Sequence, residues 1–511
     1  MGYDLSVPAA QVYAFGIREG LFTCKDIVVG LSGGPDSVML LLMLSEIREA
    51  VGEDFPRLHA VHINHNIREE ALKDQELSRK LASDLDVPFT VYSEDVLTIS
   101  SEMKRSVEDT GRIVRYRAFR DYIAGKGLTD AYIAVAHHKD DVAETVMLNL
   151  FRGSGLEGLV SPVPKSDDVI RPLLCLRKRE ILSYLEKEDI AYATDITNSD
   201  SEYTRNAWRN KILPLIGEYS VKDPVEAVND TYRLLKDDLM FLESEASSAY
   251  EKCRVTVKGH TFVKAQLPDG YPDAIRSRIL RLLWKDTFSN LTDFSSRNTA
   301  DCLEALSRKE NTRLDMPFGR IFVKAGGYIA FCVEEDYLSV TLLIARLQGF
   351  VTAVEHTSCK IDIPKGKDKS KTTILPNSDI QIKCEIIENI KGLAYNNKSW
   401  FCPIFDGDET MDLVLCNGSL THRFKRAGSD CSKPLGRLLM SLRVPKEARD
   451  FVMYVESRGE IIWIPGIGAS QGIVSERAYE AWKKEIGGTQ PAYFLKVSLV
   501  DGDGKEEYGS V

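Results

Sequence analysis

Residues 26–44, DIVVGLSGGPDSVMLLLML, decide the fold of the first part of this chain. The β-branched run from Ile27 to Val29 is typical of a buried strand, and the apolar run from Val38 to Leu44 is typical of a helix. The glycines between them permit backbone angles and close approaches that a Cβ would block. Because free N–H groups and the dipole at a helix start favour an anion, this segment predicts a strand, a phosphate-binding turn and a helix.

The sequence of the turn indicates which type of phosphate-binding loop it forms. The turn does not end in Gly-Lys-Ser or Gly-Lys-Thr, so it is not the loop in which a lysine reaches the terminal phosphates. Asp36 suggests a Mg²⁺ ion that bridges a carboxylate and a phosphate. A glycine-rich turn without a ligand is the structural alternative. The residues predicted to bind the phosphates are Ser32, Gly33, Gly34, Pro35, Asp36 and Ser37.

Patterning along the rest of the chain predicts three domains. Strand-like and helix-like segments alternate through about residue 200, an order that predicts a parallel sheet covered by helices with a site at the carboxyl ends of the strands. We therefore expect an α/β catalytic domain over 1–217. Helical periodicity predicts a mainly helical middle domain over 218–345, and the polar, basic stretch 364–379 predicts a linker or long loop. A mixed α+β domain is expected over 380–511.

Composition excludes several classes of protein. A chain of 511 residues exceeds the usual size of one hydrophobic core. No apolar run approaches the roughly 20 residues of a bilayer span, and the start of the chain lacks the order of a signal peptide, so a cytoplasmic protein without a membrane partner is expected. The ten cysteines form no Cys-x-x-Cys pair, which excludes a metal knuckle of that type. The net charge of −10 argues against a nucleic-acid partner, although a local basic patch still binds phosphate.

Acidic side chains follow the predicted strand AYIAVAHH, residues 131–138. Asp141 and Glu144 lie three residues apart, so a helix that begins here carries both on one face near its N-terminus. Such acids can cap the helix, hold Mg²⁺ or hold a substrate ammonium group. Asp140 is a second candidate ligand of Mg²⁺.

Basic side chains mark candidate contacts to nucleotide and RNA. His65 follows the second predicted strand, where an adenine or ribose would lie, and Arg112 lies on a helix from which it could reach phosphates. Arg205 and Arg209 alternate with aromatic residues, a pattern typical of proteins that stack on bases and grip an RNA backbone. A second basic cluster lies within 422–449, and a solvated surface is the alternative for each of these groups. The candidate phosphate-binding residues of that cluster are Arg423, Arg426, Lys433 and Arg437.

These segments together resemble the tRNA(Ile)-lysidine synthetase family of the ATP pyrophosphatase (PP-loop) group. The resemblance is carried by SGGPDS, the HxNHxxR segment at 62–68, SVEDTGRIVRYRAF, HHKDDVAET, LNLFRGSG, RPLL with RKREI, and DITNSDSEYTRNAWRNKILPL. It continues in looser form through the middle and C-terminal domains, so it covers nearly the whole chain.

The resemblance implies an ATP-dependent carbon–nitrogen ligase. ATP adenylylates the 2-carbonyl oxygen of the wobble cytidine of a tRNA(Ile) with a CAU anticodon, and pyrophosphate leaves. The amine of L-lysine then displaces AMP to form lysidine, which changes decoding from AUG to AUA. The resemblance implies ATP and Mg²⁺ as cofactors and leaves a homodimer open. The implied catalytic residues are Asp36, Asp141 and Glu144, and the implied lysine-binding residues are Asp141, Glu144 and Arg205. The residues implied to contact tRNA are Arg205, Arg209, Arg423, Arg426, Lys433 and Arg437.

Two other functions compete with this one. A sulfur-inserting tRNA enzyme of the same group would share SGGxDS, but it typically needs paired cysteines. A non-catalytic RNA-binding protein with a nucleotide-binding fold would be expected to have lost SGGxDS or the acids at 140–144, and this chain has both.

Overall fold

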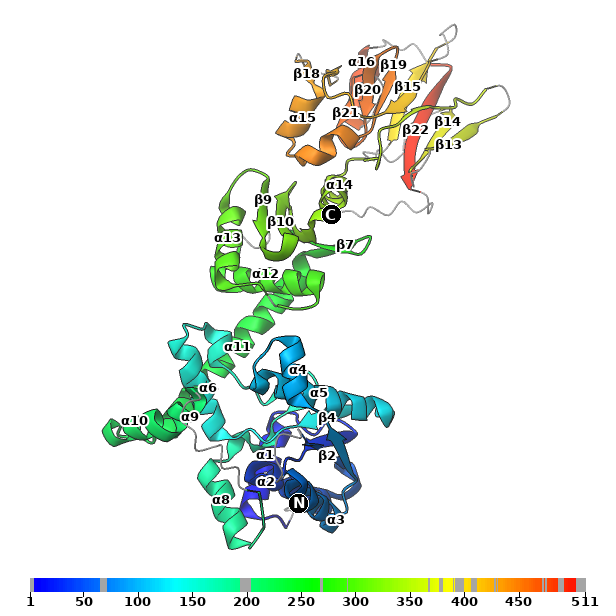
Figure 1. Ribbon diagram of the computed structural model, residues 1–511. Helices are drawn as coiled ribbons and strands as arrows, with labels where there is room; N and C mark the ends of the chain where they lie inside the picture. The colour runs from blue at the N-terminus through cyan, green and yellow to red at the C-terminus, as the bar shows by residue number, and fades with distance from the viewer. Residues whose placement is uncertain are drawn as a thin grey trace. The chain divides into compact units, whose positions relative to one another are not determined.

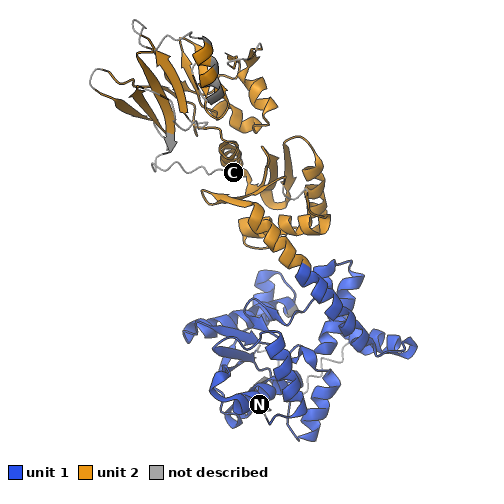
Figure 2. Cartoon of the chain, turned by 180° about the vertical axis from the view of Figure 1, so that it is seen from behind, with its two compact units in different colours: residues 1–241 blue, residues 242–511 orange. Residues whose placement is uncertain are grey.

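The computed structural model divides the chain into two compact units, residues 1–241 and 242–511 (Figure 2). Each unit is described by itself. The structure describes residues 4–64, 71–193, 204–266, 270–291, 293–365, 368–375, 380–388, 390, 399–405, 411–426, 429, 431–470, 473, 476–485 and 491–501.

The first unit is built on a six-stranded sheet with the order β3-β2-β1-β4-β6-β5. Two of its strands, β2 and β4, are labelled in Figure 1. The strands from β3 to β6 run parallel, and the edge strand β5 pairs with β6 antiparallel. The strands are β1 (Asp26–Gly30), β2 (Arg57–Asn64), β3 (Phe89–Ser93), β4 (Ala131–Ala134), β5 (Lys165–Ser166) and β6 (Val169–Ile170).

Helices follow most of these strands, as the predicted alternation requires. They are α1 (Val7–Arg18), α2 (Pro35–Val51), α3 (Ala71–Asp84), α4 (Val96–Met103), α5 (Val107–Gly125), α6 (Lys139–Phe151), α7 (Leu156–Leu159), α8 (Lys178–Lys187), α9 (Thr204–Ala207), α10 (Leu213–Tyr219) and α11 (Pro224–Cys253). A π-helical turn, η4 (Trp208–Ile212), joins α9 to α10, and α11 passes from the first unit into the second.

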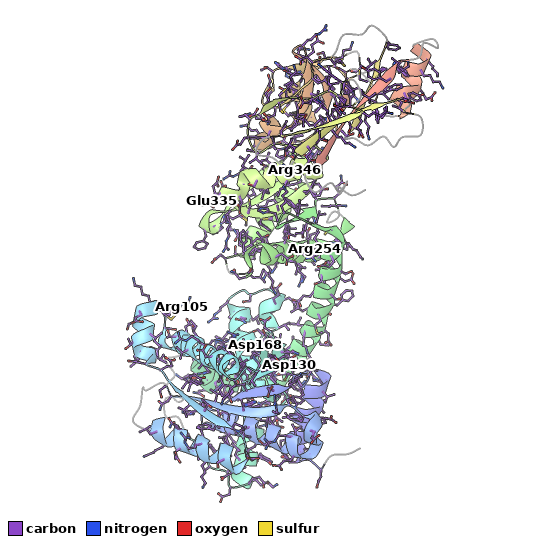
Figure 3. The ribbon with its side chains drawn as sticks, turned by 90° about the vertical axis from the view of Figure 1, so that its right-hand side faces the viewer. Arg105, Asp130, Asp168, Arg254, Glu335 and Arg346 are labelled. Atoms are coloured by element: carbon purple, nitrogen blue, oxygen red, sulfur yellow. The ribbon has the colours of Figure 1, made fainter. Side chains whose placement is uncertain are left out.

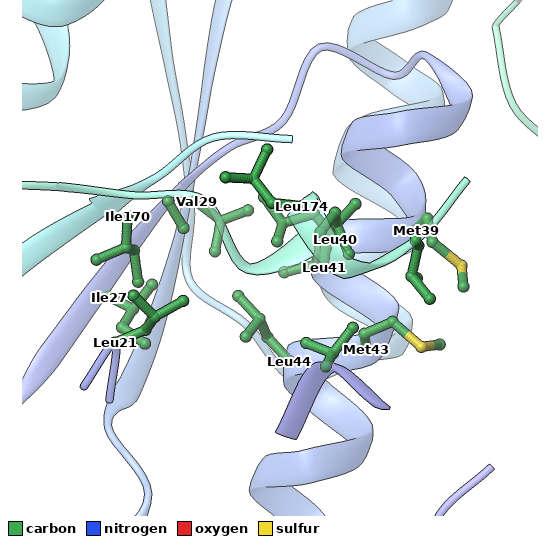
Figure 4. Packing of buried hydrophobic residues seen from close by; sticks show 14 of the residues in the cluster. Leu21, Ile27, Val29, Met39, Leu40, Leu41, Met43, Leu44, Ile170 and Leu174 are labelled. Atoms are coloured by element: carbon green, nitrogen blue, oxygen red, sulfur yellow. The ribbon is translucent and has the colours of Figure 1, made fainter. Parts of the chain in front are cut away.

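Both faces of β1 are buried, which explains why its sequence is continuously apolar. Ile27 and Val29 pack in one cluster with α1 and α2, where Leu40 of α2 is fully buried (Figure 4). Val28 packs on the opposite face with Phe119 of α5. Burial of one such aliphatic side chain contributes roughly 2 kcal/mol, so these contacts fix the start of α2 relative to the end of β1.

The order of the strands creates a crevice at the carboxyl edge of the sheet. After β1 the chain adds β2 and β3 on one side, and β4 and β6 lie on the other. In open α/β sheets, ligands bind at the point where the strand order reverses in this way. The turn SGGPDS leaves β1 and the pair His137–His138 leaves β4, so both segments meet at the crevice.

The opposite, amino edge of the sheet carries a buried carboxylate. Asp26 is 2% exposed and accepts hydrogen bonds from Arg57 Nη2 at 2.8 Å and His59 Nε2 at 2.9 Å. Asp130 and Asp168, labelled in Figure 3, precede β4 and β6 at the same edge. Burial acts to raise the pKa of Asp26, but the hydrogen bonds from Arg57 and His59 outweigh it and the pKa is lowered.

The first part of the second unit contains helices around an antiparallel sheet with the order β7-β8-β11-β10-β9. Its helices hold more residues than its strands, so the predicted mainly helical middle region is confirmed, with a five-stranded sheet that the periodicity did not reveal. The elements are β7 (Arg254–Val257), β8 (His260–Lys264), α12 (Asp273–Phe288), α13 (Ser296–Ser307), β9 (Thr312–Met316), β10 (Arg320–Ala325), β11 (Tyr328–Val333) and α14 (Tyr337–Leu347).

The rest of the second unit is mixed α+β, as expected, with sheets of order β12-β16-β19-β20-β21 and β13-β14-β22-β15 and the two-stranded pair β17-β18. Its strands are β12 (Ser358–Lys360), β13 (Ser370–Ile374), β14 (Ile380–Ile387), β15 (Ser399–Ile404), β16 (Val414–Cys416), β17 (Arg423–Phe424), β18 (Lys433–Pro434), β19 (Tyr454–Ser457), β20 (Glu460–Ile464), β21 (Gly468–Ala469) and β22 (Tyr493–Asp501). Its helices are α15 (Leu435–Ser441) and α16 (Glu476–Glu485).

The fold class predicted for the three regions is therefore confirmed. The domain boundaries at 217, 345 and 380 stay predictions, as does the linker at 364–379, within which β13 forms.

The paired Asp26 makes the stability of the first unit depend on pH. Because its pKa is lowered in the folded state, its contribution is present above the unfolded value of about 3.9 and is lost as the pH falls through the folded pKa. We expect Asp26→Asn to destabilise the first unit by about 2 kcal/mol at pH 7, and the difference from the unsubstituted protein to shrink at pH 3. Calorimetric unfolding at both pH values measures this, and a difference that does not change with pH would contradict it.

Candidate functional site

The conformation of the turn after β1 is fixed by hydrogen bonds of its two serines. Ser37 Oγ accepts from the backbone N–H of Ser32 at 3.1 Å and lies 3.1 Å from Ser32 Oγ. Ser37 Oγ also donates to the carbonyl of Gly34 at 3.0 Å. Gly34 is the N-cap of α2 without a side-chain cap, so the first N–H groups of a 17-residue helix point at the turn. This arrangement is suited to bind a phosphate group.

Gly33 is required by both its conformation and its surroundings. Its φ of +87° lies in the left-handed region, and a Cβ built on it would stand 3.1 Å from Ser78 Oγ and 3.2 Å from the carbonyl oxygen of Asp74. Its own carbonyl accepts a hydrogen bond from the N–H of Ala193 at 2.9 Å. The turn is therefore closely packed against α3 and against the segment after α8.

A cavity of about 490 Å³ opens beside this turn, a size typical of a small-ligand pocket. Its lining includes Ser32, Gly34, Asp36 and Ser37 from the turn and Arg112 from α5. It also includes His62, Asn64, Asp74, Arg115, Tyr116 and His137. Polar groups from the ends of β1, β2 and β4 and from the three helices α2, α3 and α5 thus converge on one space.

His137 contributes a neutral ring to this cavity. Burial lowers the pKa of His137 to about 4, so the imidazole is uncharged near neutral pH. Its Nδ1 is buried and has no hydrogen-bond partner among the residues that the structure describes. A polar ligand in the cavity can supply that partner.

Asp36 lies in the first turn of α2 and is paired with a cation from a distant segment. Lys178 Nζ donates a hydrogen bond to Asp36 Oδ1 at 2.6 Å. His138 Nε2 lies 3.8 Å from the same oxygen and 3.6 Å from Asp141 Oδ2. His138 is 1% exposed, so it forms a buried bridge between the phosphate turn and the start of α6.

Arg177 binds Asp140 through both carboxylate oxygens. Arg177 Nε donates to Oδ2 and Arg177 Nη2 to Oδ1, each at 3.2 Å, and the backbone N–H of Lys178 donates to Oδ2 at 2.8 Å. Arg177 Nη1 also bonds Asp223 and Glu226, each at 3.0 Å. Burial acts to lower the pKa of Arg177, but these carboxylates outweigh it and raise the pKa.

Asp141 and Glu144 lie on one face of α6, as predicted, and two arginines cover them. Arg205 Nε donates to Glu144 Oε2 at 2.9 Å, and Arg209 Nε donates to Glu144 Oε1 at 2.5 Å. Asp141 Oδ1 accepts from Arg205 Nη2 at 3.3 Å and from Arg209 Nη2 at 3.1 Å. Glu144 is fully buried, whereas the arginine side chains are 39% and 36% exposed.

Capping, the structural alternative for these acids, accounts for one contact only. Asp141 Oδ2 accepts the backbone N–H of His138 at 2.9 Å. Burial acts to raise the pKa of Asp141, but His138 and Arg205 outweigh it and lower the pKa. Burial acts to lower the pKa of Arg209, but the hydrogen bond and charge of Glu144 outweigh it and the pKa is raised. The lowered pKa keeps Asp141 ionised, and both Asp141 and Glu144 accept hydrogen bonds from guanidinium groups.

The predicted tRNA-binding residues of the second unit gather on a hairpin and a short helix. Arg423 lies on β17 and Lys433 on β18, which pair antiparallel, and Arg437 lies on α15. Arg426 follows β17 and is exposed. Arg423 donates to Ser432 Oγ at 3.2 Å and to the Ser432 carbonyl at 2.6 Å, so the hairpin fixes the direction of its guanidinium.

The structure brings the predicted residues of the first unit together around two neighbouring centres, the phosphate turn and the α6 acids. His65 lies outside the described residues. The sequence analysis missed Arg177 and Lys178. The signal that could have found them is a pair of cations at the start of a predicted helix, where the helix dipole disfavours them.

No helix in the described part of the chain combines the length and hydropathy of a membrane span.

Comparisons with known proteins give a consistent set of relatives. Residues 9–216 match the family model of the PP-loop domain. The chain is 30% identical over 449 residues to a tRNA(Ile)-lysidine synthase of Caldanaerobacter subterraneus subsp. tengcongensis, with 87% of this chain and 90% of the relative covered. It is 28% identical over 447 residues to a tRNA(Ile)-lysidine synthase of Clostridium perfringens, with 87% and 91% covered. A solved U34-tRNA thiolase from Methanococcus maripaludis shares 19% identity over 45% of this chain and 78% of that one, with a TM-score of 0.38.

The contacts of Gly33 predict that this position tolerates no side chain. We expect Gly33→Ala to abolish measurable binding of ATP, because the new Cβ would push the turn away from Asp74 and Ser78. Gly52→Ala is the matched control: Gly52 has a φ of +81°, but a Cβ there would meet nothing within 4 Å. Both variants should lose roughly 1 kcal/mol of stability from backbone strain. Calorimetric titration with ATP measures the affinity of each variant. Equal affinities in the two variants would contradict the prediction.

Proposed function

This chain belongs to the tRNA(Ile)-lysidine synthase family of ATP-dependent ligases, and from that premise we propose that it joins L-lysine to the wobble cytidine of the tRNA(Ile) with a CAU anticodon. The observation that carries the proposal is the convergence of a phosphate-binding turn and a pair of cation-binding carboxylates at one edge of one sheet. The named relatives do not favour a sulfur-inserting or non-catalytic function.

ATP is proposed to bind along the turn after β1 with its phosphates toward the start of α2. Ser32, Gly33, Gly34, Pro35 and Ser37 would supply hydroxyl and N–H donors. Arg112 lines the same cavity and is proposed to contact the nucleotide. His65 is proposed to contact the nucleotide on the basis of the sequence alone. The size of the cavity and its lining of donors support this placement.

Asp36 is the proposed ligand of Mg²⁺, since a carboxylate at a phosphate turn suits a hard cation. When bound, the ion would withdraw charge from the phosphoryl oxygens of ATP. Asp140 is a weaker candidate, because both of its oxygens accept hydrogen bonds from Arg177 and Lys178. A metal at Asp140 would have to replace those donors.

Asp141 and Glu144 are proposed to bind the amine of the substrate lysine. The support is that these two carboxylates already hold two guanidinium groups, so their surroundings suit a cation. The arginines are partly exposed and the carboxylates are not, so the arginine side chains are the partners that can move. Arg205 is proposed to line the lysine site, and its contacts to Asp141 and Glu144 support that.

The proposed reaction has two steps. The 2-carbonyl oxygen of the cytidine attacks the α-phosphorus of ATP, the bond to the β-phosphate breaks, and pyrophosphate leaves with the negative charge. The lysine amine must then lose a proton before it attacks C2, and Asp141 or Glu144 can accept that proton. The C2–O bond breaks and AMP leaves with the oxygen.

RNA contacts are proposed for Arg205 and Arg209 in the first unit and for Arg423, Arg426, Lys433 and Arg437 in the second. A homodimer is a proposal from the sequence alone, and sedimentation velocity of the full chain tests it.

Glu144→Gln tests the lysine site directly. Radiolabelled lysine should enter the CAU tRNA(Ile) in the presence of ATP and not without it. We expect Glu144→Gln to raise the KM for lysine about tenfold or more, because a charged partner of the ammonium is lost. Adenylylated RNA should still form.

The matched control is Glu157→Gln, which changes an exposed glutamate of α7. A Glu144→Gln protein that cannot adenylylate the RNA would assign these acids to ATP or to the metal. Failure of the unsubstituted protein to incorporate lysine would remove the proposed function altogether.

Arg423→Ala combined with Arg426→Ala tests the proposed RNA contact of the second unit. Each phosphate contact that is lost should reduce the slope of log affinity against log salt by about one. The double variant should therefore raise the KM for tRNA with little change in the rate at saturating tRNA. Filter binding across salt concentrations measures the slope. An unchanged slope would show that Arg423 and Arg426 face solvent and do not contact RNA phosphates.

A further inference from the structure

Lys178 is a cation placed where its own helix disfavours it. It is the first residue of α8, and Lys178, Arg177 and Arg179 are three successive cations at a helix N-terminus. The dipole there favours anions, so local helix stability does not explain a lysine at this position. Its ammonium group instead lies 2.6 Å from Asp36 Oδ1, inside the phosphate turn.

The backbone of Lys178 is fixed by bonds that do not involve its side chain. Its N–H donates to Asp140 Oδ2 at 2.8 Å, and its neighbour Arg177 holds the same carboxylate at 3.2 Å. The carbonyl of Leu176 accepts the N–H of Lys139 at 2.8 Å. The start of α8 is thus attached to the start of α6, and the side chain of Lys178 is 28% exposed.

The turn itself lacks the lysine that other phosphate loops carry, and Lys178 comes to it from 142 residues further along the chain. We propose that Lys178 is a phosphate-binding residue of this site, which leaves Asp36 when ATP binds and donates hydrogen bonds to the β- and γ-phosphoryl oxygens and then to the released pyrophosphate. This inference rests on the proposed cleavage of ATP between the α- and β-phosphates.

The proposed role requires no transfer of the lysine proton. The bond between the α-phosphorus and the bridging oxygen breaks, the electron pair stays on that oxygen, and pyrophosphate carries the charge. The ammonium group stabilises this charge as it develops. Asp36, once released from Lys178, has both carboxylate oxygens free of that partner and can face a cation.

A structural role predicts something different. If Lys178 served only to neutralise Asp36, its loss would lower stability without a specific loss of affinity for pyrophosphate. The stability of the variants and their affinity for pyrophosphate therefore have to be measured together.

The experiment titrates the full chain with sodium pyrophosphate in a calorimeter, with and without MgCl₂. The variants are Lys178→Met, Lys178→Arg and the control Lys187→Met. Lys187 lies on the same helix, is 78% exposed and pairs with Glu188 at 3.1 Å. We expect Lys178→Met to bind pyrophosphate about tenfold more weakly, since a charge-assisted hydrogen bond is lost. Lys178→Arg should retain most of the affinity, and Lys187→Met should retain all of it.

Thermal unfolding of each variant excludes loss of fold, and Lys178→Gln replaces Lys178→Met if the latter does not fold. Unchanged affinity in the neutral variants, or an equal loss in Lys187→Met, would overturn the proposal. So would an unsubstituted protein that binds no pyrophosphate. Because the titration contains neither RNA nor lysine, a failure to form lysidine would leave this result standing, and the two proposals can fail separately.

Discussion

The site depends on the pairing of negative charge that is partly or fully buried. Four carboxylates, Asp36, Asp140, Asp141 and Glu144, lie at the carboxyl edge of the first sheet, and four cations meet them from later parts of the chain. Removing a carboxylate from water without a partner costs free energy of folding. The four carboxylates can therefore lie close together only because cations pair with them. The chain after β6 therefore has two roles: it completes the fold of the first unit, and it balances the charge that the site concentrates.

This balance also explains how the site can accept charged substrates. Each cation is more exposed than, or comparably exposed to, the carboxylate that it covers, apart from Arg177. Arg177 is nearly buried and bonds three acids, so it works as a fixed anchor for the start of α8. In the proposed reaction, Lys178, Arg205 and Arg209 exchange one anion for another. In this account, incoming phosphates replace Asp36 as the partner of Lys178, and an incoming ammonium group replaces a guanidinium group as the partner of Asp141 and Glu144.

Much of the first unit could be predicted from the sequence because its signals are local. The run at 27–29, the glycines of the turn and the helix after them indicate strand, turn and helix without any tertiary information. The spacing of Asp141 and Glu144 placed both acids on one helix face, which the structure confirms. The partner of Asp36 could not be predicted, because its contact with Lys178 spans 142 residues and no periodicity encodes it. The sheet of the middle region was missed because its strands are short and lie between strongly periodic helices.

The central claim is that the cytidine carbonyl oxygen is adenylylated and departs with AMP. The most direct test uses a tRNA(Ile) whose wobble cytidine carries oxygen-18 at the 2-carbonyl, incubated with the protein, ATP, Mg²⁺ and L-lysine. Mass spectrometry of the products then follows the label. The account predicts one oxygen-18 atom in AMP and none in pyrophosphate for each lysine joined. Lysine incorporation with unlabelled AMP would contradict it.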